Sequence, residues 1–265
     1  MRSSFLFVFL AGMVLPGCTH VAEAVVHERD IRLRSGAEIP VRIHAATGHK
    51  LLLWLPSEHG QRPEEAEAAA RLARAGIEVW MADMLEAYFL PPLMSSLDRI
   101  PAADTANLIG VAHRESGKTV YLLAAGRGGK TALEGAFEWR LRWAPKLGDR
   151  VLGGAVLIYP NLYVATPRPG QPARYLPVVR ETRLDIAVLQ PQLSPWYWYL
   201  DRQQQALAGG GGRVRSRVLP GVRNRFYFRP DASEKEQALG GRLHELILQA
   251  LSELQRLDTK ETSGP

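Results

Sequence analysis

Cysteine is nearly absent from this 265-residue sequence, since Cys18 is the only one. A single cysteine excludes a disulfide within the chain, a Cys-x-x-Cys redox pair and a zinc site built on several thiolates. Histidine is missing from the whole stretch between His113 and His244, and no metal-ligand spacing occurs elsewhere. We therefore expect neither a metal nor another cofactor.

Long apolar runs are also missing beyond the N-terminus, so no segment there is predicted to span a bilayer. The formal net charge is +6, with arginines concentrated at 213–217 and 223–225. No nucleic-acid recognition motif accompanies these arginines, so we interpret them as a solvated face and expect no nucleic-acid partner. The length suits one well-buried domain.

The N-terminus has the pattern of a processing segment. One positive charge in residues 1–4 precedes an apolar stretch over 5–14, which is typical of a signal peptide. Residues 15–18, Leu-Pro-Gly-Cys, resemble a bacterial lipobox. The resemblance implies a signal peptide over 1–17, a lipid on Cys18, a tether over 18–26 and a membrane anchor facing the periplasm. Thr19 favours the outer membrane, and an ordinary cleaved signal with a free thiol is the alternative.

Strand and helix patterns alternate through the rest of the chain. Strands are expected at 27–34, 38–45, 50–55, 77–83, 118–123, 153–160, 185–190 and 213–219, and helices at 62–75, 104–115, 133–143, 196–207 and 234–257. Segments 84–101 and 161–177 are interpreted as connections. This order predicts an α/β fold with a mostly parallel, doubly wound sheet that begins with an antiparallel hairpin. The domain is expected over 27–257, followed by a disordered tail over 258–265.

The stretch from Lys118 to Leu133 organises the chain, because an apolar strand leads into a tight small-residue turn and then a helix start. Over roughly residues 25–255 the chain resembles the α/β-hydrolase superfamily, which places its nucleophile on such a turn as G-x-S-x-G. The turn here reads Ala-Ala-Gly-Arg-Gly, and Gly126 stands at the nucleophile position. Glycine has no side chain with which to attack a carbonyl.

The other two positions of the triad are also changed. The resemblance places the acid in the loop after strand 185–190, where Ser194 precedes Pro195 in place of an aspartate. It places the histidine after the last strand, where Asn224 stands instead. Without an imidazole, an ordinary serine mechanism has no base. The sequence therefore predicts a degenerate triad at Gly126, Ser194 and Asn224.

Polar residues nevertheless remain at the predicted edge of the sheet. His59 lies in an HG segment of the kind that the family uses for its oxyanion hole, Asp83 ends the next strand, and Arg127 follows the turn. With Tyr88, these residues form our candidate pocket. The alternative is that His59 and Asp83 are ordinary turn and loop residues and that Arg127 forms an ion pair with Asp83 or Glu134.

Three functions follow as hypotheses. The first is a membrane-tethered, non-catalytic binding or scaffolding module of the bacterial cell envelope. The second is an ester or amide hydrolase with a relocated centre, using Ser194 as nucleophile or His59 with Asp83 as an acid–base pair. The third is a structural partner of an envelope protein, with the loop at 161–177 and the basic segment at 213–225 as contact surfaces.

Overall fold

The computed structural model describes residues 25–148, 151–167 and 171–261. The expected signal peptide and the expected lipidation residue Cys18 lie outside the described residues. Within them, no helix is both long and apolar enough to cross a bilayer.

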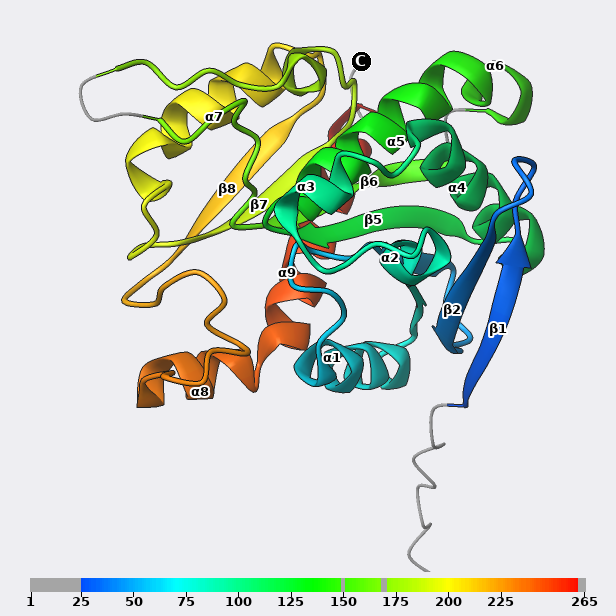
Figure 1. The fold of residues 1–265 in the computed structure, drawn as a ribbon, viewed down its shortest axis with the longest axis horizontal. Helices are drawn as coiled ribbons and strands as arrows, with labels where there is room; N and C mark the ends of the chain where they lie inside the picture. The colour runs from blue at the N-terminus through cyan, green and yellow to red at the C-terminus, as the bar shows by residue number, and fades with distance from the viewer. Residues whose placement is uncertain (1–24, 149–150, 168–170, 262–265) are drawn as a thin grey trace, which may run out of the picture.

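One eight-stranded sheet forms the centre of the molecule, in the order β1-β2-β4-β3-β5-β6-β7-β8 (Figure 1). The strands are β1 (Val26–Arg32), β2 (Glu38–His44), β3 (Lys50–Trp54), β4 (Ile77–Ala82), β5 (Thr119–Ala125), β6 (Leu152–Ile158), β7 (Ile186–Pro191) and β8 (Val214–Leu219). Strand β2 pairs antiparallel with both β1 and β4, and every other pairing is parallel. The predicted hairpin and parallel sheet are confirmed.

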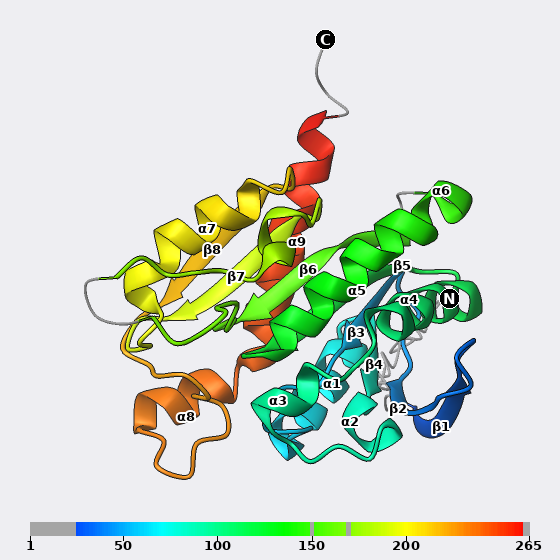
Figure 2. The same cartoon turned by 45° about the horizontal axis from the view of Figure 1, so that its top comes forward.

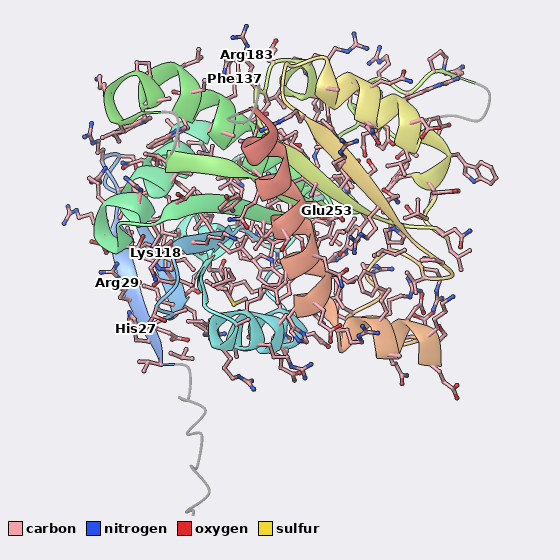
Figure 3. All side chains as sticks on the ribbon, turned by 180° about the vertical axis from the view of Figure 1, so that it is seen from behind. His27, Arg29, Lys118, Phe137, Arg183 and Glu253 are labelled. Atoms are coloured by element: carbon pink, nitrogen blue, oxygen red, sulfur yellow. The ribbon has the colours of Figure 1, made fainter. Side chains whose placement is uncertain are left out.

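Helices cover both faces of the sheet, which explains why the central strands are continuous apolar runs. The helices are α1 (Pro63–Arg74), α2 (Met84–Ala87), α3 (Met94–Leu97), α4 (Ala102–Ser116), α5 (Gly128–Arg142), α6 (Ala144–Leu147), α7 (Leu200–Ala208), α8 (Glu234–Gly240) and α9 (Leu243–Glu261). Helices α4, α5 and α7 lie on one face (Figure 2), and α9 crosses the other face with α1 beside it (Figure 3).

Two apolar cores result, one on each face of the sheet. In β5, Leu122 belongs to the core under α4 and α5, whereas Leu123 belongs to the core under α1 and α9. The apolar stripe that the sequence predicts for the last helix is buried in this second core: Leu243, Leu246, Ile247, Ala250, Leu251 and Leu254. Because successive side chains of a strand point to opposite faces of the sheet, β5 contributes to both cores.

The expected closing helix over 234–257 is two helices, and this prediction is corrected. Helix α8 ends at Gly240 and α9 begins at Leu243. A Cβ on Gly240 would lie 2.8 Å from the Tyr227 backbone, so a close approach requires glycine there, and consecutive glycines weaken a helix. Helix α9 also continues past Leu257 to Glu261, into the expected tail. The connection at 84–101 carries the short helices α2 and α3.

Candidate functional site

The turn after β5 is a left-handed bend at Gly126. Its φ is +54°, a conformation that favours glycine. The Gly126 N–H donates to the Ile158 carbonyl at 3.0 Å, and the Gly126 carbonyl accepts from the Asn161 N–H at 2.9 Å. These bonds fix the turn against the end of β6. The predicted strand–turn–helix unit is therefore present, with α5 beginning at Gly128.

The carboxylate of Glu58 fills the space that a side chain at position 126 would need. A Cβ built on Gly126 would lie 2.4 Å from Glu58 Oε2 and 2.7 Å from Glu58 Oε1. The Arg127 N–H donates to Glu58 Oε2 at 2.8 Å. In α/β-hydrolases the N–H of the residue after the nucleophile is part of the oxyanion hole. Glu58 thus occupies the space that the resemblance assigns to the nucleophile and accepts from the N–H that the resemblance assigns to the oxyanion hole.

The loop after β3 places Glu58 there because β3 and β5 are parallel neighbours whose carboxyl ends meet. Ser57 pairs with Gly60 in a short bridge, and the His59 N–H donates to Ser57 Oγ at 3.2 Å. A Cβ on Gly128 would lie 2.4 Å from the Pro56 carbonyl oxygen, so this loop can approach α5 only because residue 128 is glycine. Sequence reasoning identified the segment but missed Glu58 as its key residue.

His59 lies beside Glu58 and is partly exposed. Its Nε2 is 4.0 Å from Glu58 Oε1, and its ring packs 5.5 Å from the Phe228 ring. Burial lowers the pKa of His59, and Arg225 and Arg62 lower it further, against the opposing effect of Glu58. The lowered pKa favours the neutral imidazole, which does not balance the charge of the carboxylate.

A cavity of about 370 Å³ opens next to Gly126, and we call it the Gly126 cavity. Two of its walls come from the loop after β3 and the loop after β8. Its lining residues are Glu58, His59, Met94, Gly126, Tyr159, Asn161, Leu193, Pro195, Trp196, Arg223, Asn224, Arg225 and Arg229. The cavity lies at the carboxyl edge of the parallel strands, where open α/β sheets bind ligands.

The structure brings together only part of the predicted set. His59, Gly126 and Asn224 line the Gly126 cavity, and Oδ1 of Asn224 is buried without a hydrogen-bond partner. Ser194 is 3% exposed, and its hydroxyl accepts from the Trp196 N–H at 3.1 Å within its own loop. Its neighbours Leu193 and Pro195 line the cavity.

The other candidates are engaged elsewhere. Asp83 caps α2 through the Glu86 N–H at 3.0 Å, and Tyr88 donates to Asp104. The Arg127 side chain reaches Asp98 at 3.1 Å rather than Asp83 or Glu134. We predicted one pocket that contains His59 together with three other residues: Asp83, Tyr88 and Arg127. Of these four residues, only His59 lines the Gly126 cavity.

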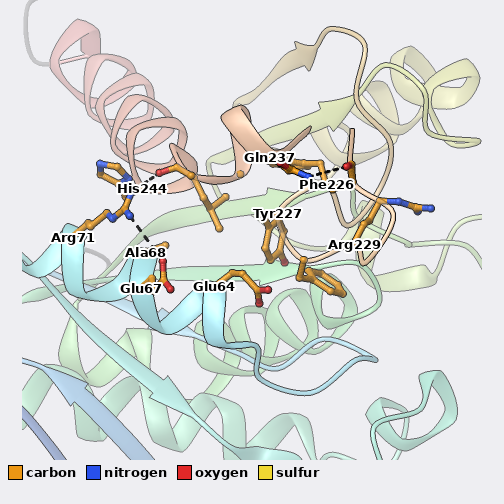
Figure 4. A pocket seen from close by; sticks show the side chains of 14 residues that line it. Glu64, Glu67, Ala68, Arg71, Phe226, Tyr227, Arg229, Gln237 and His244 are labelled. Atoms are coloured by element: carbon orange, nitrogen blue, oxygen red, sulfur yellow. Dashed lines mark hydrogen bonds and ion pairs between the residues drawn. The ribbon is translucent and has the colours of Figure 1, made fainter. Parts of the chain in front are cut away.

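A buried carboxyl lies behind the cavity. Glu65, in the first turn of α1, accepts from the Tyr227 hydroxyl at 2.9 Å, and Tyr227 lies 3.2 Å from the hydroxyl of Tyr159, a wall of the Gly126 cavity. Burial raises the pKa of Glu65 to about 7. Figure 4 shows Tyr227 in a second cavity, of about 290 Å³, between α1, α8 and the start of α9.

Metal ligands are not clustered in the part of the chain that the structure describes, where no group of three histidine, cysteine, aspartate or glutamate side chains could hold an ion.

Comparison with known proteins identifies the fold. No family model and no curated protein matches the chain. Among solved structures, an esterase from Pyrobaculum calidifontis is 15% identical, with a TM-score of 0.57 over 85% of this chain and 86% of its own. Esterase 2 from Thermogutta terrifontis, phosphoramylated by tabun, is 12% identical, with a TM-score of 0.59 over 91% and 98%. An arylesterase is 13% identical, with a TM-score of 0.59 over 87% and 88%. These similarities, with the strand order above, show an α/β-hydrolase fold.

Proposed function

Starting from an α/β-hydrolase fold with glycine at the nucleophile position, we propose that this protein is a non-catalytic binding module that holds a small ligand in the Gly126 cavity. One observation carries the proposal: the Glu58 carboxylate occupies the space of the missing nucleophile and accepts from the Arg127 N–H at 2.8 Å. A negative charge at that point repels the oxyanion that ester hydrolysis would develop. The turn is preserved as a wall of a cavity.

The relocated hydrolase is the second candidate, and it has less support. A nucleophilic Ser194 needs a base, but its hydroxyl accepts a backbone hydrogen bond within its own loop. The pairing of His59 with Asp83 lacks contact, because Asp83 caps α2 and the carboxylate next to His59 is that of Glu58. In each version, the nucleophile or acid and its base therefore lack the contact that the mechanism requires.

The basic segment at 213–225, which the scaffolding hypothesis uses as a contact surface, has fewer unpaired arginines than the sequence indicates. Within the basic segment, Arg213 pairs with Asp185, Arg217 with Glu253 and Arg223 with Glu236. These guanidinium groups stabilise the fold around β8 and are already matched by acidic partners. A small ligand in the cavity therefore has more structural support than a protein partner on this face.

The membrane-tethered form is part of the proposal and rests on the sequence. We propose that Cys18 carries lipid and that the domain faces the periplasm from the outer membrane. The residues between Cys18 and β1 would provide the tether, since β1 begins at Val26. Two or more acyl chains are sufficient for stable anchoring.

The catalytic part of the proposal is tested with the chain from residue 19 onward. We expect no turnover of p-nitrophenyl esters and no labelling by a fluorophosphonate probe. The Thermogutta terrifontis esterase, which reacts with tabun, serves as the positive control for the probe. Labelling that disappears in Ser194→Ala, or ester turnover that disappears in His59→Ala with an unchanged melting temperature, would overturn the proposal in favour of the hydrolase.

A further inference from the structure

Residues of opposite charge line the Gly126 cavity without forming an ion pair. Glu58 and Arg225 both line it, and no ion pair joins them in the part of the chain that the structure describes. Burial is the largest influence on the pKa of His59, which Glu58 raises and Arg225 lowers. We call Glu58 the negative side of the cavity and Arg225 its positive side.

The positive side belongs to Arg225 in particular. Arg223 is held by Glu236 at 2.6 Å and by Asp231 at 2.9 Å, and Arg229 is held by Asp231 at 2.8 Å. Among the described residues, no carboxylate lies within ion-pair distance of Arg225. Of the three arginines that line the cavity, Arg225 is thus the one whose charge is available to a ligand.

The backbone at Arg225 is in a strained conformation. Its φ is +63°, in the left-handed region, where a residue with a long side chain is uncommon. Such strain is concentrated at binding and catalytic sites. Glycine or asparagine would adopt this turn more readily. We take the strained backbone as support for a role of the guanidinium in the cavity.

The negative side is the Glu58 carboxylate. Among the described residues, no lysine or arginine lies within ion-pair distance of Glu58, and the lowered pKa of the neighbouring His59 favours its neutral form. The carboxylate accepts one bond, from the Arg127 N–H, and retains further lone pairs. Asn224 also lines the cavity, but its Oδ1 is buried, so Glu58 is the acceptor that a ligand can reach. A carboxylate with an uncompensated negative charge fits an ammonium group, which has only donors.

On the basis of the proposed binding function, we infer that the Gly126 cavity binds a small zwitterion, with its ammonium group on Glu58 and its carboxylate on Arg225. A free amino acid or a short peptide with both termini unmodified has this chemistry. The cavity of about 370 Å³ lies at the lower end of the range for small-molecule sites. Trp196 and Leu193 provide apolar contacts for a side chain.

Calorimetric titration of the chain from residue 19 onward tests the inference. The probes are the common free amino acids and alanyl-alanine, together with N-acetyl-alanyl-alanine and alanyl-alanine amide, each of which lacks one charge. We expect a zwitterion to bind, and blocking either terminus to weaken binding by roughly 10- to 100-fold, the value of a charge-assisted hydrogen bond.

Three variants locate the two ends of the ligand. Glu58→Gln retains an acceptor for the Arg127 N–H and removes only the charge. Arg225→Gln removes the guanidinium, and Arg215→Gln, at an exposed position of β8, controls for the loss of a positive charge. We expect Glu58→Gln and Arg225→Gln each to weaken zwitterion binding by roughly tenfold or more. Arg215→Gln should bind like the wild type.

The pattern across probes separates this inference from the proposed function. Arg225→Gln should have no further effect on the amide probe, and Glu58→Gln none on the acetylated probe. Failure of every zwitterion to bind, or binding that is insensitive to both variants, would overturn the inference. Binding of the acetylated or amidated probe alone would also overturn it and leave the non-catalytic module standing. Fluorophosphonate labelling would instead overturn the proposed function itself.

Discussion

Gly126 and Glu58 are coupled through the space they share. The substitution Gly126→Ala places a methyl group against the carboxylate, which must leave the Arg127 N–H. Together with the positive φ, this should lower the free energy of unfolding by roughly 1–3 kcal/mol. In a Glu58→Ala background the contact is absent, so the same substitution should cost about 0.5–2 kcal/mol less. Urea unfolding of the four proteins measures the coupling.

A matched control separates backbone strain from contact. Gly117 has a φ of +69°, and a Cβ there would meet nothing within 4 Å. Gly117→Ala therefore reports the cost of the left-handed backbone alone. If Gly126→Ala costs no more than Gly117→Ala, the Glu58 carboxylate does not hold the position described above.

Arg225 offers the opposite case, in which a substitution should stabilise the fold. Arg225→Gly removes a long side chain from a left-handed residue, and we expect a gain of about 0.5–1 kcal/mol in the free energy of unfolding. Thermal and urea unfolding check the sign. Arg215→Gly, in extended β8, should destabilise the protein instead. A loss of stability in Arg225→Gly would mean that the side chain contributes to the fold.

At the scale of elements, α1 carries a buried acid whose protonation is linked to folding. Burial raises the pKa of Glu65 to about 7, above the usual value of 4.5 for an exposed glutamate. The folded state therefore holds a proton that the unfolded chain has released between these two values. Stability should fall as the pH rises through this window and should level off above it, by roughly 1–3 kcal/mol in total.

Glu65→Gln should remove this part of the pH dependence, because an amide does not titrate in the range. Its carbonyl can accept from the Arg62 N–H, as the Glu65 carboxylate does at 3.1 Å. Urea unfolding at pH 5 and at pH 8 compares the variant with the wild type. Glu67→Gln, on the exposed side of the same helix, controls for the loss of a negative charge. Parallel pH profiles for wild type and Glu65→Gln would refute the linkage.

Local sequence patterns were sufficient to predict most helices and strands, but they did not predict the long-range contacts between side chains. The apolar run at 50–55 predicted β3 and the six-residue stripe predicted the buried face of α9, because burial on a strand or helix has a fixed period. The pairing of Arg127 with Asp98 was missed, since the connection at 84–101 has no periodic pattern that would place Asp98. Glu58 was missed for a similar reason: its significance appears only when β3 and β5 lie side by side.

At the scale of the whole molecule, the first strand of the domain, β1, is one edge of the sheet, and β8 is the opposite edge (Figure 1). The Gly126 cavity lies beyond the middle of the sheet, after β3, β5 and β8. A tether attached at β1 would therefore leave the cavity accessible from solution.

Cys18→Ser tests the predicted anchor in the full chain. We expect the protein to move from the membrane fraction to the soluble fraction, because the thiol that would carry the lipid is missing. The domain should keep the melting temperature of the chain from residue 19 onward. A protein that stays in the membrane fraction after this substitution would be held there by something other than a lipid on Cys18.

The carboxylate beside Gly126 also limits how this chain could evolve. A serine at position 126 would meet the acidic side chain of Glu58. Under the proposed non-catalytic function, hydrolysis would require changes at several positions, and the change at position 126 alone would reduce stability. If the proposal holds, selection can therefore alter the lining of the Gly126 cavity more readily than it can place a nucleophile on this turn.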